Sequence, residues 1–226
     1  MRVDPFLEAE FPGLRVLELE LESLTVRPRD PRLESAKARI LATSRSRGTT
    51  LDALREAPLF RAYREFYWRV GVDPTKTRPA AEAIARRVLG GRELPTINTL
   101  VDAYNLASLE SSIAIAAFDR DRIHPAALTL RRARAGEEFV GIGMTKPLRL
   151  TGVEAVIEDE ADRELVAVYP YRNAERSKVT EATRAALLMM CGVPGIDDEA
   201  LENARERCRT LIREACRPDG TPPDAP

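Results

Sequence analysis

Between Leu94 and Asp119 the chain runs for 26 residues without a lysine or an arginine. The whole sequence carries 35 of these cations in 226 residues, a density that would place about four in this stretch. The only charged residues in it are Asp102, Glu110 and Asp119. Lys and Arg are almost never fully buried unless they are paired. A segment that lacks them in so cationic a chain is therefore predicted to lie inside the protein or to line a cleft.

A helix is predicted inside this stretch, from about residue 99 to 112, and it has a polar face. Five polar side chains, four of them amides or hydroxyls, recur along it at spacings of four, three, three and four, which places them on one side of a helix. Such groups form directed hydrogen bonds with a small polar ligand such as an amino acid. A solvated face, or internal bonds that tie the helix to loops, explains the same pattern. The residues are Asn98, Asp102, Asn105, Ser108 and Ser112.

The other elements follow from periodicity and from helix-stop residues. Residues 14–26 alternate between apolar and polar side chains, which predicts a strand. Pro79 and the pair Gly90-Gly91 bracket a helix over 79–89. Further helices are predicted over 32–43, 51–70 with a break near Pro58, 180–190 and 199–215. Further strands are predicted over 126–130, 139–142, 153–157 and 165–169.

The order of these elements predicts an α+β fold. The later strands do not alternate regularly with helices, as they would in a doubly wound parallel sheet. We expect residues 1–63 to form an N-terminal strand and helices packed on a core domain. We expect residues 64–216 to form that mixed domain with its C-terminal helices, and residues 217–226, with four prolines among them, to be a disordered tail.

The composition of the chain excludes several kinds of protein. Lys plus Arg number 35 against 36 Asp plus Glu, so the chain as a whole has no electrostatic attraction to nucleic acid, and any basic surface must be local. Three cysteines without a metal-binding spacing predict reduced thiols, with no metal site and no disulfide framework. No targeting segment or membrane-length apolar run is visible, and we expect a cytoplasmic protein without membrane contact.

Cations gather just before and along the predicted helix at 79–89. Arginine and lysine at such positions neutralise RNA phosphates whatever the base sequence, so a phosphate-contacting patch is one interpretation. An ordinary solvated helix face is the other. The residues are Lys76, Arg78, Arg86 and Arg87, with Arg92 beside them.

The familiar catalytic motifs are missing from the sequence. His124 is the only histidine, so a Ser-His-Asp or Cys-His mechanism would depend on one loop residue. The sequence has no phosphate-binding Gly-Lys-Ser/Thr loop, no dinucleotide fingerprint and no His-Glu-x-x-His. Nucleotide hydrolysis and zinc hydrolysis therefore have no support, and no cofactor is expected.

Several short motifs resemble one family. The stretch from Gly71 to Ile123 is similar to the core of the B3/B4 domain, the region that carries editing in bacterial phenylalanyl-tRNA synthetase β subunits. The resemblance extends over about residues 64–188. The matching segments are Arg78-Pro79, Arg87-Val88-Leu89-Gly90-Gly91, Leu94-Pro95-Thr96-Ile97-Asn98, Val101-Asp102-Ala103-Tyr104-Asn105, Phe118-Asp119-Arg120-Asp121-Arg122-Ile123, Leu130-Arg131-Arg132-Ala133, Gly136-Glu137, Arg172-Asn173 and Ser177-Lys178-Val179-Thr180.

The resemblance implies an α+β fold with a pocket for the aminoacyl group of a mischarged tRNA. It implies hydrolysis of the ester of misacylated tRNA in trans. The alternative is a non-catalytic module that binds tRNA, through its acceptor end, or a free amino acid. Nothing resembles the ATP-binding module of a class II synthetase, so no ligase activity and no DNA partner are expected.

The resemblance also assigns residues. Asn105 matches a position in the synthetase editing site, and Glu137 is a candidate carboxylate for orienting water, or a residue that closes the turn after Gly136. Ala116 stands where the synthetase domain usually carries a histidine shortly before Phe-Asp. With that position, the candidate substrate-binding residues are Asn98, Asp102, Tyr104, Ser108, Ala116 and Arg172, and the candidate tRNA-binding residues are Lys76, Arg78, Arg86 and Arg87.

Overall fold

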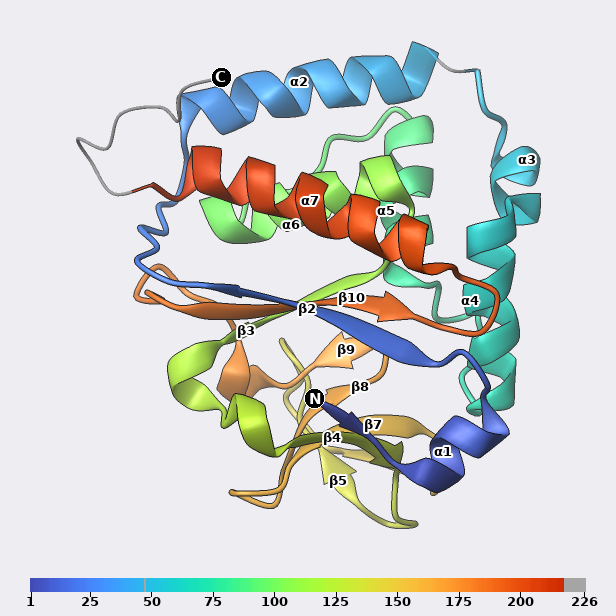
Figure 1. Cartoon of the computed structure of the whole chain (residues 1–226). Coiled ribbons are helices and arrows are strands. Elements are labelled where there is room, and N and C mark those ends of the chain that lie inside the picture. Colours follow the sequence, from blue (N-terminus) through green and yellow to red (C-terminus); the bar gives the residue numbers. More distant parts are fainter. Residues whose placement is uncertain (47, 218–226) are drawn as a thin grey trace.

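The molecule is built in layers (Figure 1). A computed structural model describes residues 1–46 and 48–217. A three-stranded sheet lies in the middle, with helices α2, α5, α6 and α7 on one side and a five-stranded sheet on the other. This arrangement of mixed sheets and segregated helices confirms the predicted α+β fold.

The middle sheet has the order β2-β10-β3, and both pairings are antiparallel. The strands are β2 (Arg15–Leu21), β10 (Ala186–Gly192) and β3 (Ile115–Asp119). β2 confirms the strand predicted from alternation. The helix predicted over 180–190 is wrong, since this segment contains the central strand. All seven β10 residues are buried, and a strand covered on both faces reads as a continuous apolar run that periodicity cannot distinguish from a buried helix.

The outer sheet has the order β1-β4-β7-β8-β9. β1 runs parallel to β4, and the remaining pairs are antiparallel. The strands predicted in this half of the chain are confirmed within a few residues, as β4, β5, β7 and β8. The bounds are β1 (Arg2–Val3), β4 (Leu128–Arg132), β7 (Ala155–Asp159), β8 (Glu164–Val168) and β9 (Arg172–Asn173), with the hairpin strands β5 (Glu138–Phe139) and β6 (Leu148–Arg149) outside the sheet.

The remaining predicted helices are confirmed, including the break at Pro58. That proline starts α4, because its missing N–H would be unpaired in a first turn anyway. Asn98 caps α6 and Asp197 caps α7, each accepting a bond from a first-turn backbone N–H. The helices are α1 (Pro5–Glu10), α2 (Pro31–Ser46), α3 (Leu51–Glu56), α4 (Pro58–Arg69), α5 (Ala80–Leu89), α6 (Thr99–Ser111) and α7 (Asp198–Ala215).

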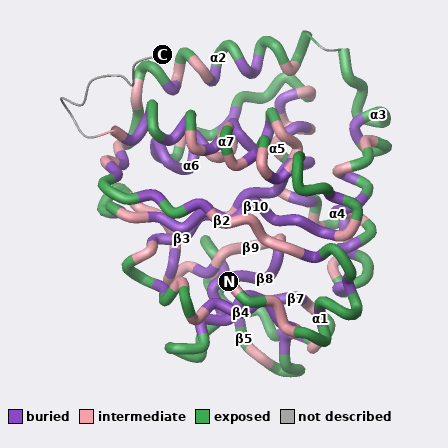
Figure 2. The backbone as a smooth tube through the Cα atoms, viewed as in Figure 1, coloured by how far each residue is buried: buried purple, intermediate pink, exposed green. Residues whose placement is uncertain are grey.

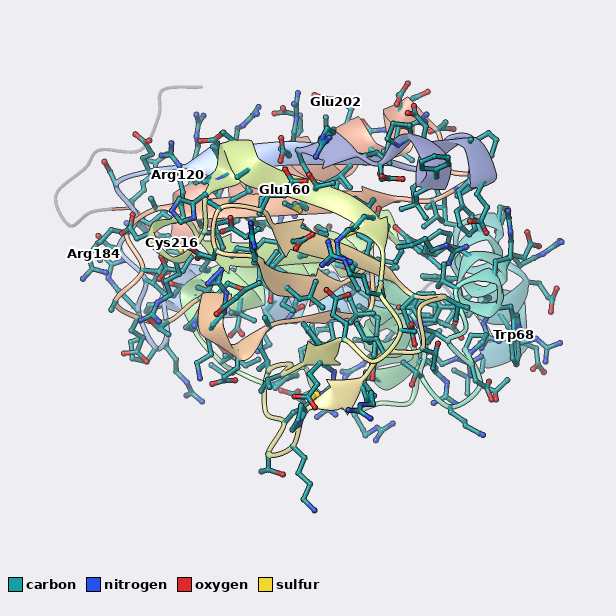
Figure 3. The ribbon with its side chains drawn as sticks, turned by 90° about the horizontal axis from the view of Figure 1, so that it is seen from below. Trp68, Arg120, Glu160, Arg184, Glu202 and Cys216 are labelled. Carbon is teal, nitrogen blue, oxygen red and sulfur yellow. The ribbon has the colours of Figure 1, made fainter. Side chains whose placement is uncertain are left out.

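Buried residues lie on α6 and on inner strands of both sheets, β10 in the middle sheet and β7 in the outer one (Figure 2). Most of the cation-free stretch is buried, as predicted. Tyr63 links α4 to the central strand β10 and to the residue before β3, donating to the Cys191 carbonyl at 2.6 Å and accepting from the Ala114 N–H at 2.9 Å. Trp68, on the same helix, is 57% exposed at the edge of the molecule (Figure 3).

The N-terminal segment is part of both sheets, because β1 pairs with β4 and β2 pairs with β10. Cys191, Cys208 and Cys216 are buried free thiols, and burial raises the pKa of Cys191 and Cys208 to about 12. Among the helices described, none has both the length and the apolar character needed to cross a lipid bilayer.

Candidate functional site

Three of the five side chains on the polar face of α6 form hydrogen bonds within the protein. The Asn98 side chain accepts from the Val101 N–H at 2.9 Å, and the Ser108 hydroxyl donates to the Ile113 carbonyl at 2.6 Å. Asp102 is 3% exposed and accepts from the Ile97 N–H at 3.0 Å. Burial raises the pKa of Asp102, although the Ile97 bond and the charge of Lys37 act in the opposite direction. These side chains fix the two ends of α6 and the loop before it.

Asn105 differs from its neighbours on this face. It is half-buried, and no hydrogen bond of its amide is found among the described residues. It lines a hollow with a cavity volume of about 450 Å³, between α5, α6 and the loop that joins them. We call this the arginine hollow, after the four arginines that line it. Its lining residues are Arg78, Ala83, Ile84, Arg86, Arg87, Arg92, Leu94, Pro95 and Asn105.

The arginine hollow has an excess of positive charge. Arg78 and Arg92 are exposed, and neither forms an ion pair with a described carboxylate. Arg87 donates through Nε to the Glu93 backbone carbonyl, and no carboxylate in the described part of the chain forms an ion pair with it. None of the described residues that line the hollow is acidic. Guanidinium groups arranged in this way suit phosphate or carboxylate oxygens.

Arg86 is held by a buried carboxylate on its own helix. The Glu82 side chain is fully buried, and it accepts from Arg64 Nε at 2.8 Å, from Arg64 Nη2 at 2.9 Å and from Arg86 Nε at 2.7 Å. Burial by itself would raise the pKa of Glu82, but the bonds from the two guanidinium groups outweigh it and hold the pKa below its usual value. Glu82 therefore joins α4 to α5 and holds Arg86, which lines the hollow.

Glu82→Gln is expected to reduce the free energy of unfolding by about 3 kcal/mol at pH 7, because it breaks a buried ion network and leaves two guanidinium groups partly uncompensated. Urea unfolding of both proteins measures the difference. A lowered folded-state pKa gives stability that is complete above the unfolded value of about 4.3 and is lost as the pH falls through the folded value. The deficit of the variant should therefore shrink below about pH 4. A deficit that is unchanged at low pH would contradict this role.

Glu137 lies in a different place. Both of its oxygens are bonded to Arg131, and Arg134 donates its backbone N–H to the carboxylate at 2.8 Å. Burial opposes ionisation of Glu137, yet the Arg131 bonds keep its pKa below the ordinary value. Glu137 lines a separate hollow with residues of β5 and β8. The structure thus does not bring the two predicted catalytic residues, Asn105 and Glu137, to one cavity.

The other predicted residues are dispersed. Ala116 on β3 is paired with Met189 on the neighbouring strand β10, and Arg172 on β9 stacks on Tyr171. Tyr104 is partly buried against the core, and burial raises its pKa. Lys76 is 85% exposed beside Asp73 and does not line the arginine hollow. The arginine hollow therefore brings Asn105 together with four arginines of the predicted cationic patch, Arg78, Arg86, Arg87 and Arg92.

One charged cluster was not predicted. The acidic run Glu158-Asp159-Glu160 is typical of a surface turn, but Glu158 and Asp159 are buried on β7. Asp159 accepts from the His124 N–H at 2.8 Å, and its Oδ2 lies 3.2 Å from His124 Nδ1. Asp162 lies close enough for the three side chains to form a metal-sized group, but Arg176 Nη2 lies 3.6 Å from Asp159 and 3.0 Å from Asp162. A guanidinium group thus already supplies a cation to these two carboxylates.

The class of protein follows from the fold together with comparisons to known proteins. The fold is shared with a crystal structure of an N-terminal fragment of the phenylalanyl-tRNA synthetase β subunit from Pyrococcus horikoshii, at a TM-score of 0.50 and 15% sequence identity. That match covers 96% of this chain and 49% of the fragment, so the chain spans about half of the fragment's length. No curated protein matches the sequence. The model of the B3/4 domain family matches residues 62–217, and the chain belongs to this family.

Proposed function

We propose that the arginine hollow binds the acceptor end of a misacylated tRNA and that the protein hydrolyses the aminoacyl ester there, in trans. The observation that carries this proposal is that four arginines line one hollow together with Asn105, whose amide has no hydrogen-bond partner among the described residues. Arginines without carboxylate partners bind the phosphates that flank the tRNA terminus. Membership of the B3/4 domain family supports the choice of an aminoacylated RNA as the ligand.

The chemistry needs no ligase machinery. Water attacks the ester carbonyl carbon, the bond from that carbon to the terminal ribose oxygen breaks, and the ribose oxygen takes a proton as the free amino acid leaves. The Asn105 amide orients the water, and a guanidinium N–H of the hollow donates to the oxyanion that forms. A hydroxyl of the terminal ribose is positioned by the substrate itself to relay the proton. The reaction is required only to outrun slow spontaneous deacylation.

A second candidate is binding without hydrolysis. It is favoured by the engagement of Glu137 with Arg131 and by the lack of an ionisable side chain at Ala116, whose neighbour across the sheet is Met189. In this case the protein binds tRNA, or a free amino acid through its carboxylate, in the arginine hollow. A cytoplasmic location is expected under either candidate.

Single-turnover deacylation of a panel of misacylated tRNAs tests the proposal. With protein in excess, at least one ester is expected to disappear faster than in buffer. Ester half-lives equal to those in buffer across the whole panel would rule out hydrolysis. Titration with deacylated tRNA and with free amino acids then tests the second candidate, which fails if neither gives a saturable signal.

A further inference from the structure

The loop that forms one wall of the arginine hollow has few backbone bonds of its own. Residues 92–98 connect α5 to α6 without regular structure, and Arg92, Leu94 and Pro95 face the hollow. Among the described residues, residues 93–97 form no backbone–backbone hydrogen bond. Three of their backbone groups are bonded to side chains: the carbonyls of Glu93 and Pro95 accept from Arg87 and Lys37, and the Ile97 N–H donates to Asp102. The shape of this wall therefore depends on the side chains that bind it.

A buried lysine on α2 contributes two hydrogen bonds to this loop. Lys37 is 5% exposed, and its ammonium group donates to the Pro95 carbonyl at 3.3 Å and to the Thr96 hydroxyl at 3.1 Å. The same ammonium lies 3.8 Å from Asp102 Oδ2, and the other oxygen of Asp102 binds the Ile97 N–H. The Lys37–Asp102 pair thus holds the loop from α2 and α6 at once.

A second cation on α2 extends this contact to the start of the loop. Arg45 donates to the Val88 carbonyl and to the Arg92 carbonyl, each at 3.3 Å. Both Lys37 and Arg45 lie before residue 62, where the family match begins. The side chains that shape the hollow therefore come partly from outside the matched domain.

We infer that Lys37, paired with Asp102, is a positioning residue that holds the 92–97 loop in the conformation in which the arginine hollow binds RNA phosphates. The inference rests on the proposed function for its ligand and on the loop contacts for its mechanism. Lys37 is too deeply buried to touch a phosphate. Its effect on RNA binding is indirect, because it positions Arg92, Leu94 and Pro95. The arginines of the hollow, in contrast, contact the RNA themselves.

Lys37→Met tests the inference, because methionine keeps the apolar stem and removes the charge. The probe is a labelled RNA hairpin with a single-stranded CCA end. The variant is expected to exchange the amide hydrogen of Ile97 about tenfold faster, because Lys37 no longer holds the loop and the Asp102 acceptor of that amide in place. It is expected to bind the hairpin about tenfold more weakly, with an unchanged slope of log K against log salt, because no phosphate contact is removed.

Arg39→Met is the matched control. Arg39 is an exposed cation on the same helix, without an ion pair among the described residues, and its loss is expected to leave both exchange and affinity unchanged. If Lys37→Met fails to fold, the double variant Lys37→Met with Asp102→Asn removes both charges and keeps an acceptor for Ile97. That variant is expected to show the same faster exchange.

Two results would overturn the inference: unchanged loop exchange in a folded variant, or unchanged hairpin affinity despite faster exchange. A native protein that does not bind the hairpin contradicts the proposed function instead. The exchange comparison still decides, in that case, whether Lys37 holds the loop.

Discussion

Replacing Asn105 by alanine is expected to lower the single-turnover rate of deacylation about 100-fold, a loss typical of removing one group that orients a reactant or stabilises the transition state. The Asn105 amide is the only uncharged polar side chain among the residues that line the arginine hollow. Its loss should leave the affinity for tRNA nearly unchanged, because the phosphate contacts remain. The measurement follows the ester of the panel member that the native protein hydrolyses fastest, with protein in excess.

Asn203→Ala provides the control for this experiment. Asn203 is exposed on α7, away from the hollow, and makes no hydrogen bond to a described side chain. The control variant should hydrolyse the ester at the native rate. A native rate for Asn105→Ala as well would show that the amide takes no part in the chemistry.

The triple variant Arg78→Met, Arg87→Met, Arg92→Met is expected to bind the acceptor hairpin on the order of 50-fold more weakly at physiological salt. Each of these arginines lacks a carboxylate partner among the described residues, and each lines the hollow. Loss of three contacts to a single strand should reduce the slope of log K against log salt by about 2. Fluorescence titrations at several salt concentrations measure both quantities.

A second triple variant controls for the loss of charge. Arg149, Arg163 and Arg213 are exposed arginines that do not line the hollow. Changing all three to methionine removes the same net charge and should alter affinity only slightly, through long-range attraction. Equal losses for the two triple variants would mean that the RNA is bound by overall charge, and the hollow would have no special role.

The sequence predicted the helices well because their boundaries carry local chemical signals. Pro58 starts α4, and Asn98 and Asp197 cap α6 and α7, so each boundary is encoded within one turn. The central strand β10 has no such signal. Its apolar run is long and buried on both faces, and only its pairing with β2 and β3, which are distant in sequence, makes it a strand.

The sequence predicted the components of the candidate site one by one, but it did not predict which of them lie together in the fold. The polar helix face and the cationic patch are visible as local patterns, but the hollow forms only when α5 and α6 pack against each other across the 90–98 loop. The importance of Lys37 could not be predicted, because its partners Pro95, Thr96 and Asp102 lie 58 or more residues away. Glu137 shows the opposite case, where a plausible carboxylate proves to be engaged by Arg131.

The central claim is that the acceptor end of tRNA lies in the arginine hollow, and site-specific photocrosslinking tests it most directly. A photoreactive amino acid would be placed at Ala83, which is exposed on α5 and lines the hollow. The same group at Ala161, an exposed turn residue after β7, serves as the control. We expect Ala83 to crosslink to the terminal CCA nucleotides of a bound tRNA and Ala161 to give no crosslink. Crosslinks from Ala161 alone, or from Ala83 to another part of the tRNA, would contradict the claim.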